Sequence, residues 1–386
     1  MSHQILLPRM MEIGKGASNK VSEVLVKLNC RKPLLVTDQM MVELGYVDKI
    51  VAELAAKSTV VDVFADTVPE PTVSSIEAGV AMVRNNNYDS IIALGGGSPI
   101  DSAKAIAIVG KKGGQMRDYK FPQITDEPGL PIIAIPTTAG TGSEVTRFTI
   151  ITDETTSEKM LCVGSGFMPT AALVDYSLTL SLPQRITADT GIDALTHAIE
   201  AYVSRKANLY SDAQALSAMA LIAPNLRTVF ADGRNEQARE AMMLGATLAG
   251  IAFSNSSVAL VHGMSRPIGA AFHVPHGLSN AMLLPAVTAY SIPSAKARYA
   301  QCARAMGVAT QANTDEQATA LLLEELCALN ADLQVPTPAE FGIDKAAFFA
   351  LTTTMAEQAL ASGSPGNNPR IPSITEMETI YTSLWS

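Results

Sequence analysis

The stretch Ser90-Ile91-Ile92-Ala93-Leu94-Gly95-Gly96-Gly97-Ser98-Pro99 and the alanine-rich residues 100–109 that follow it decide the fold. Residues 90–94 predict a buried strand, and Pro99 is well placed to open a helix over 100–109. Glycines allow close backbone approach and a helix N-terminus offers free N–H groups, so the turn between the two elements suits a pyrophosphate. The spacing differs from the usual G-x-G-x-x-G pattern, and a tight turn without a ligand is an equally good interpretation.

The same alternation extends on both sides of this turn. The predicted strands are 33–38, 59–64, 90–94 and 130–136, and the predicted helices between them are 47–57, 74–85 and 100–109. Strands alternating with helices indicate a mainly parallel, Rossmann-like sheet wrapped by helices. After Ser181 alanine, leucine and methionine dominate, and we expect helices over 192–204, 210–230, 236–252, 293–306 and 316–329. The sequence therefore predicts an α/β dinucleotide-binding domain over residues 1–180 and an all-helical domain over 181–386.

A second polar turn, Pro136 to Glu144, follows the strand 130–136. Open α/β sheets bind ligands at the carboxyl ends of their strands, and two such turns on successive strands favour nucleotide binding. Asp38 ends the first strand of the alternation, where a carboxylate can bind the adenosine ribose and select NAD over NADP. The alternative is that Asp38 caps a helix that begins at Gln39.

The composition excludes several classes of function. The chain has 386 residues, a formal net charge of −9, 47% hydrophobic residues and only 17% charged residues. Abundant aliphatic residues argue against disorder, and the acidic balance argues against a nucleic-acid partner. The four cysteines lie far apart and no signal peptide is visible, so we expect a cytoplasmic protein.

The shortage of charge is concentrated between Ala241 and Ala295. Arg266 is the only formally charged side chain there, and the stretch holds three of the five histidines. Residues 241–265 are long enough to span a bilayer, but their serines, asparagine and histidine favour a buried pair of helices. We expect Pro267 and Pro275 to break the helix between His262 and His276.

The predicted metal ligands lie in the helical half. Asp193 and His197 are four residues apart and so share one face of a helix. His262 and His276 are the other candidates, because one carboxylate and three neutral imidazoles can hold a divalent transition metal with room for a substrate oxygen. A lone buried histidine is usually only a hydrogen-bonded core residue, but the crowding of histidines in charge-poor sequence favours metal ligation.

These motifs resemble the iron-containing (group III) alcohol dehydrogenases. The run Thr190 to Glu200 is similar to the metal-binding helix of that family, and His262-Gly263-Met264 with Pro275 to Asn280 resembles its second signature. Gly95 to Lys104 and Pro136 to Glu144 resemble its nucleotide domain, and Asn368-Pro369-Arg370 resembles a C-terminal element. The resemblance covers nearly the whole chain in order.

The resemblance implies a two-domain dehydroquinate synthase-like architecture, a homodimer and an NAD(H)-dependent alcohol dehydrogenase or aldehyde reductase for a small primary alcohol or aldehyde. It implies that Asp193, His197, His262 and His276 hold Fe²⁺, with Zn²⁺ as the alternative ion. The ion would bind the alcohol oxygen and lower its pKa, and hydride would pass from the alkoxide to nicotinamide. The NAD-binding residues that it implies are Asp38, Gly95, Gly96, Gly97, Ser98, Asp101, Thr137, Thr138, Thr141, Thr146, Phe148, Ile150, Lys159 and Leu178.

Three positions depart from the family pattern or add to it. Many relatives carry a histidine where this chain has Arg266, and they often carry asparagine where it has Glu70. No cofactor role is therefore assigned to Glu70. His273 is an additional histidine, which we interpret as a residue outside the ligand set.

Arg266 is the main indication of the substrate. An unpaired guanidinium in an apolar setting is costly, so Arg266 either binds an acidic group of a short substrate or the cofactor, or pairs with a carboxylate such as Glu144 or Asp101. There are two alternatives to the reduction of a neutral aldehyde. One is a dehydrogenase for a short anionic hydroxy acid, and the other is a lyase of the dehydroquinate synthase-like superfamily.

Overall fold

The computed structural model describes residues 2–156 and 158–385. The chain divides into two compact units, which are described separately. One comprises Gln4–Thr179, and the other comprises Leu180–Ser386 together with Met1–His3.

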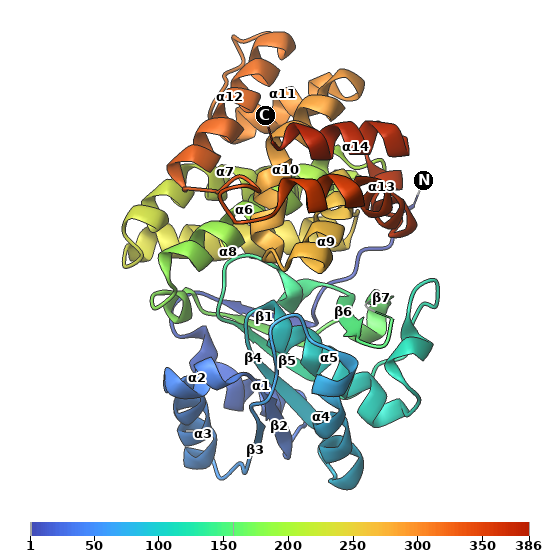
Figure 1. Cartoon of the computed structure of the whole chain (residues 1–386). Coiled ribbons are helices and arrows are strands. Elements are labelled where there is room, and N and C mark those ends of the chain that lie inside the picture. The colour runs from blue at the N-terminus through green and yellow to red at the C-terminus, as the bar shows by residue number, and fades with distance from the viewer. Residues whose placement is uncertain (1, 157, 386) are drawn as a thin grey trace. The chain divides into compact units, whose positions relative to one another are not determined.

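The N-terminal unit is built on a six-stranded parallel sheet, as the alternation of strands and helices predicts (Figure 1). The strand order is β1-β8-β5-β4-β2-β3. The strands are β1 (Met10–Ile13), β2 (Pro33–Val36), β3 (Asp62–Phe64), β4 (Ser90–Gly95), β5 (Ile132–Pro136) and β8 (Ala171–Val174). Every residue of β2, β4, β5 and β8 is buried, as expected for a parallel sheet covered on both faces.

Two hydrophobic cores cover the two faces of this sheet. One core joins Leu34 and Val36 to α4 (Val73–Asn85), α5 (Gly97–Lys112) and the hairpin of β6 (Phe148–Asp153) and β7 (Glu158–Val163). The other core joins the intervening residue Leu35 to the opposite set of helices. These helices are α1 (Val21–Lys27), α2 (Gln39–Glu43) and α3 (Tyr46–Ala56). The unit is therefore a doubly wound α/β domain.

The strand order reverses between β2 and β4. The chain runs outward from β2 to β3 and then returns to the other side of β2, where β4 continues the sheet toward β5. Ligands of open α/β sheets bind at the carboxyl ends of the strands on either side of such a reversal. Asp38 follows β2 and Gly96 follows β4, so the predicted ribose-binding carboxylate and the glycine turn both lie at this point.

The described residues of the C-terminal unit form helices and loops and no strand (Figure 1). Its α-helices are α6 (Gln184–Val203), α7 (Leu209–Ala231), α8 (Glu236–Ser254), α9 (Leu260–Phe272), α10 (His276–Ser291), α11 (Lys296–Ala305), α12 (Asp315–Asp332), α13 (Lys345–Ala361) and α14 (Ile374–Ser383). The Rossmann-like fold class with a helix-rich C-terminal half is thus confirmed. Among the described residues, no helix combines the length and hydropathy needed to cross a bilayer.

Close helix packing in this unit depends on glycine at two positions. A Cβ atom on Gly191 of α6 would lie 2.4 Å from a methyl carbon of Leu226 of α7. A Cβ atom on Gly277 of α10 would lie 2.3 Å from the carbonyl oxygen of Asp189 of α6. The second contact brings the first turn of α10 against α6, one turn before Asp193.

The expectation that Pro267 breaks a helix is wrong. α9 continues through Pro267 to Phe272, because proline removes only one N–H from the ladder and the helix remains packed along its length. The break lies at His273, whose left-handed φ of 55° ends α9, and at Pro275, which precedes α10. The sequence patterns also gave no prediction for β1, β6, β7 and β8.

Candidate metal centre

One face of α6 carries three ionisable side chains. Asp193, His197 and Glu200 follow one another at spacings of four and three residues, so they lie on one side of the helix. All three are buried, with residue exposures of 2%, 5% and 3%. Buried ionisable groups need partners, and α9 and α10 supply them.

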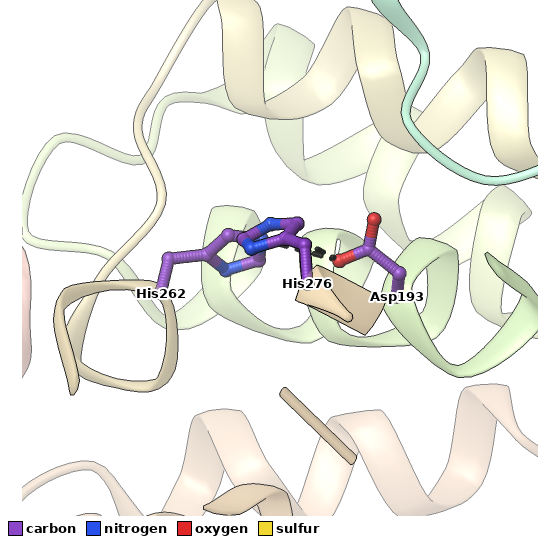
Figure 2. Close-up of side chains that lie close together, drawn as sticks. All are labelled: Asp193, His262 and His276. Carbon is purple, nitrogen blue, oxygen red and sulfur yellow. Dashed lines mark ion pairs between the residues drawn. The ribbon is translucent and has the colours of Figure 1, made fainter. Parts of the chain in front are cut away.

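His262 in the first turn of α9 and His276 at the start of α10 converge on Asp193 (Figure 2). Oδ1 of Asp193 lies 3.4 Å from Nε2 of His262 and 3.8 Å from Nε2 of His276. One donor atom from each of the three residues lies within 4.8 Å of the others. The side chain of His276 is 37% exposed, which leaves one side of the cluster accessible.

This donor set fits a divalent transition metal. Two ligands about 2.1 Å from a tetrahedral ion lie about 3.4 Å apart, close to the distances between Asp193 and the two imidazoles. One carboxylate and two or more imidazoles suit iron or zinc rather than magnesium or calcium, which prefer oxygen ligands.

His197 lies beside this cluster. Its ring stacks on His262 with centroids 4.4 Å apart and on Phe253 with centroids 4.3 Å apart, and its Nδ1 lies 3.9 Å from Oδ2 of Asp193. The structure thus brings three of the four predicted ligands to one point and places the fourth in contact with two of them. Metal ligation by His197 stays a prediction.

Glu200 orients His262 and was not identified from the sequence. Its Oε2 lies 2.6 Å from Nδ1 of His262 and accepts a hydrogen bond from the backbone N–H of Ala259, while Oε1 accepts from the N–H of Val261. The carboxylate therefore caps the N-terminus of α9 and directs Nε2 of His262 toward Asp193. The signal in the sequence was its position seven residues after Asp193, on the same face of the helix.

Asn280, one turn after His276 on α10, also contacts the cluster. Its Nδ2 donates to Oδ1 of Asp193 at 2.7 Å and lies 3.2 Å from Nε2 of both histidines. The amide holds the three donor atoms together, and a bound ion would replace these contacts. Asn280 belongs to the second signature in the sequence, but nothing there indicated this role.

The electrostatics of the cluster assign different protonation states to its histidines. Burial disfavours the charged form of His262, but Glu200 and Asp193 outweigh burial and raise its pKa to about 9. Desolvation lowers the pKa of His276, and the positive charges of His262 and Arg266 act in the same direction. Burial also raises the pKa of Asp193, but the surrounding imidazoles outweigh it and hold that pKa well below its usual range.

The affinity of this site for a divalent ion is expected to fall in acid. Near neutral pH, His262 must lose one proton to present Nε2 to a metal, whereas His276 and Asp193 need to lose none. The dissociation constant for Zn²⁺ should therefore decrease about tenfold per pH unit, or about 100-fold from pH 6 to pH 8. Calorimetric titrations in two buffers with different ionisation enthalpies should give the release of about one proton. A dissociation constant that does not change with pH would contradict this assignment.

Glu200→Gln is expected to weaken metal binding about 10- to 100-fold, because a neutral amide supports His262 less well than a carboxylate. The measurement is competition for Co²⁺ or Zn²⁺ against a chromophoric chelator, together with the visible spectrum of the Co²⁺ form. Glu240→Gln is the matched control, since Glu240 is exposed on α8. Equal metal affinity in the two variants would rule out this role for Glu200.

The glycine turn after β4 provides a cradle in the N-terminal unit. A Cβ atom on Gly97 would lie 2.8 Å from a methyl carbon of Thr141, and one on Gly96 would lie 3.3 Å from the corresponding carbon of Thr138. Oγ1 of Thr137 is buried without a hydrogen-bond partner among the described residues. The two predicted turns therefore lie side by side, and the hydroxyl of Thr137 is available to bind a ligand. This arrangement fits a phosphate group.

Other predicted cofactor residues already have structural partners. Oδ1 of Asp38 accepts a hydrogen bond from the N–H of Met41, so Asp38 caps α2, as one of its two interpretations predicts. The two carboxylate oxygens of Asp101 accept from Oγ of Ser143 and from the N–H of Ile150. Thr146 accepts a hydrogen bond from Nζ of Lys104. Cofactor contacts by these side chains stay predictions.

The β6–β7 hairpin carries three further candidates. Phe148 and Ile150 share the half-buried face of β6, and Lys159 lies on β7 opposite Thr152. Nζ of Lys159 lies 2.7 Å from Oε1 of Glu70, whose N–H donates to Oγ of Ser98 beside the glycine turn. Leu178 lies apart from the hairpin, in the core that contains α1 and α3.

His273 and Arg266, the two positions that add to or depart from the family pattern on or directly after α9, differ in their exposure to solvent. His273 is exposed and ends α9, in agreement with its interpretation as a residue outside the ligand set. Arg266 lies one turn after His262 on α9, and its Nη1 donates to Oγ of Ser364 at 3.1 Å. Burial lowers the pKa of its guanidinium.

Comparisons with known proteins agree with this geometry. Residues 8–176 match the family described as "Iron-containing alcohol dehydrogenase", and residues 187–385 match "Fe-containing alcohol dehydrogenase family, C-terminal". Lactaldehyde reductase of Escherichia coli (strain K12) is 36% identical over 388 residues, which cover all of both chains.

Two solved structures extend the likeness. The crystal structure of a 1,3-propanediol oxidoreductase has a TM-score of 0.95 and 35% identity, and it covers 100% of both chains. A sulfoacetaldehyde reductase from Bifidobacterium kashiwanohense, solved in complex with NAD⁺, has a TM-score of 0.90 and 27% identity, with coverage of 100% of this chain and 99% of that one. Neither gives any sign of lyase chemistry. Since matches to the family span both halves of the sequence, this chain belongs to the iron-containing alcohol dehydrogenase family.

Proposed function

We propose that this enzyme interconverts a small primary alcohol and its aldehyde with NAD(H), using a divalent ion that is normally Fe²⁺. Residues 1–180 would bind the dinucleotide, and residues 181–386 would hold the ion through Asp193, His197, His262 and His276. The observation that carries the proposal is the convergence of one carboxylate and two imidazoles within 4.8 Å.

The side chains have distinct tasks in this proposal. When bound, the divalent ion supplies a Lewis acid for the alcohol or carbonyl oxygen, and NAD(H) supplies or accepts the hydride. Glu200 keeps Nε2 of His262 directed at the ion, and His276 stays neutral near pH 7 and so ready to bind it. Apolar neighbours such as Phe253 pack on His197 and limit the access of water.

The glycine turn supports a dinucleotide as the second reactant. The cradle formed by Gly96 and Gly97 opens onto Thr138 and Thr141, and the hydroxyl of Thr137 is available as a donor. Asp38 would bind the ribose and favour NAD over NADP with the carboxylate oxygen that does not cap α2. By family resemblance we also expect a cytoplasmic homodimer, and light scattering on the purified chain measures its mass.

The test is a screen of small aldehydes and alcohols on enzyme loaded with Fe²⁺ under anaerobic conditions, with a Zn²⁺-loaded sample in parallel. Absorbance at 340 nm should change in step with aldehyde or alcohol consumed, and NADPH should be a poorer reductant than NADH. Full activity after metal removal, or turnover without any net change in NADH, would overturn the proposal.

A further inference from the structure

Arg266 is a half-buried cation of the helical unit that lacks a matching anion. Its Nε is buried without a hydrogen-bond partner, and the single hydrogen bond of its guanidinium goes to the neutral hydroxyl of Ser364, both within the described part of the chain. Among the described residues of the C-terminal unit, no carboxylate lies within 4 Å of the guanidinium. A charge that is partly removed from water in this way is costly unless a partner of opposite charge joins it.

The carboxylate that interacts with Arg266 within the unit is already engaged. Glu200 interacts electrostatically with Arg266, but its two oxygens serve His262 and the N–H groups of Ala259 and Val261. Asp193 faces the imidazoles and Asn280. Neither carboxylate forms an ion pair with Arg266, so the guanidinium keeps its capacity to bind an anion.

Arg239 is a buried arginine whose hydrogen bonds are structural, although its Nη2 has no partner among the described residues. Its Nε donates to the carbonyl oxygen of Gly233, and its Nη1 donates to Oγ1 of Thr187. Arg239 thereby ties the loop before α8 to α6. Arg266 donates no hydrogen bond to a carbonyl oxygen among the described residues, and it lies on the face of α9 that carries His262.

Ser364 lies in a loop that packs against α9. The short helix η7 (Ser364–Asn367) packs on α9, where a Cβ atom on Gly263 would lie 2.7 Å from the ring of Pro365. Asn367 anchors the loop by donating to Oγ of Ser257. The hydroxyl of Ser364 is 3.1 Å from Nη1 of Arg266, so the guanidinium and a second polar group are held in place together.

We propose that Arg266 and Ser364 form a subsite for the acidic group of the substrate, so that the enzyme acts on short alcohols and aldehydes that carry a carboxylate, sulfonate or phosphonate. The inference rests on the proposed alcohol dehydrogenase function. Side chains four residues apart on a helix lie about 6 Å apart. The spacing between His262 and Arg266 therefore suits a molecule with one or two carbons between the alcohol carbon and the acidic group. The planar guanidinium can bind such a group through two parallel hydrogen bonds.

The experiment compares matched pairs of alcohols in the direction of NAD⁺ reduction. The pairs are 3-hydroxypropanoate with 3-hydroxypropanamide, and 2-hydroxyethanesulfonate with 2-(methylsulfonyl)ethanol. In the wild type, kcat/KM should be at least about tenfold higher for the anion of at least one pair. Arg266→Gln should lower the ratio of anion to neutral analogue about 100-fold, and Ser364→Ala should lower it less.

Binding of a non-reacting anion separates this inference from the proposed activity. Zn²⁺-loaded wild type should bind ethanesulfonate in calorimetry, Arg266→Gln should not, and Arg234→Gln should bind it like the wild type because Arg234 is exposed in the loop before α8. If no alcohol is oxidised but ethanesulfonate binds through Arg266, the proposed function fails and the anion subsite stands.

Three outcomes overturn the subsite. The first is a wild type without any preference for the anion. The second is an equal loss on both members of a pair in Arg266→Gln, which assigns the residue a structural or general catalytic role. The third is a selective loss of NAD⁺ affinity in that variant, which assigns it to the cofactor.

Discussion

His262→Ala is expected to lower the affinity for Fe²⁺ or Zn²⁺ at least about a thousandfold and to remove measurable turnover. Residues that only support a metal ligand contribute about 10- to 100-fold to affinity, and His262 supplies a donor atom itself. Its Nε2 is one of three atoms that converge within 4.8 Å, so its loss leaves two. Metal content after gel filtration, chelator competition and the assay at 340 nm measure the effect.

His276→Ala separates the loss of metal from a loss of stability. Removing His262 also leaves Glu200 buried without its imidazole partner, which is destabilising in its own right. The side chain of His276 is 37% exposed, and its removal strands no buried carboxylate. His276→Ala should therefore lose metal and activity to a similar degree while its melting temperature stays near that of metal-free wild type. Wild-type metal affinity in a folded His276→Ala protein would contradict the proposed centre.

The local part of the metal centre could be predicted from the sequence. The spacing of Asp193 and His197 placed both on one face of a helix, and the cluster of histidines in charge-poor sequence pointed to His262 and His276. The role of Glu200 could not be predicted, because it depends on the angle at which α9 meets α6. The contacts of Asn280 likewise appear only when α10 lies against α6, where Gly277 allows close approach.

In the α/β half, hydrophobic periodicity predicted the central strands. It missed elements, such as β1, that are stabilised mainly by contacts with distant parts of the chain. The residues of β2, β4 and β5 are continuous apolar runs because the sheet is covered on both faces. β1 is only four residues long and partly exposed, and it is held by its pairing with β8. The contact of Lys159 with Glu70 joins residues 89 apart, which no local pattern can anticipate.

The sequence indicated no separate role for Lys104, which ends the motif Gly95 to Lys104. In the structure, Lys104 connects the segments beside the glycine turn. Its side chain on α5 is fully buried. Its Nζ donates to the carbonyl oxygens of Phe148 and Thr146 and to the hydroxyls of Thr146 and Ser143, at 2.7 to 3.1 Å. Oδ1 of Asp101 lies 4.0 Å away and accepts from the same Ser143 hydroxyl. One ammonium group therefore joins α5 to the segment that carries the second polar turn.

Lys104→Met is expected to lower the free energy of unfolding of the N-terminal unit at pH 7 by about 3 to 5 kcal/mol. Methionine fills a similar volume, but it leaves several buried acceptors without their donor and the carboxylate of Asp101 without its neighbouring cation. The melting temperature reports the loss, and hydrogen exchange of peptides covering 97–112 and 143–153 locates it. Lys111→Met is the matched control, because Lys111 is exposed near the end of the same helix.

The dependence on pH has a definite sign. Burial lowers the pKa of Lys104 from 10.5 to about 8, so between pH 8 and 10.5 the unfolded chain binds a proton there that the folded chain has released. This group therefore raises the free energy of unfolding of the wild type as pH rises through that window, by at most about 3 kcal/mol. Lys104→Met has no ionisable group at this position, so its stability lacks this dependence on pH. The gap in stability between wild type and Lys104→Met should widen from pH 7 to pH 9.5, while the gap between wild type and Lys111→Met stays constant. If the Lys104→Met gap instead narrows with rising pH, then Lys104 stabilises the fold mainly through its charge on Asp101 rather than through its hydrogen bonds.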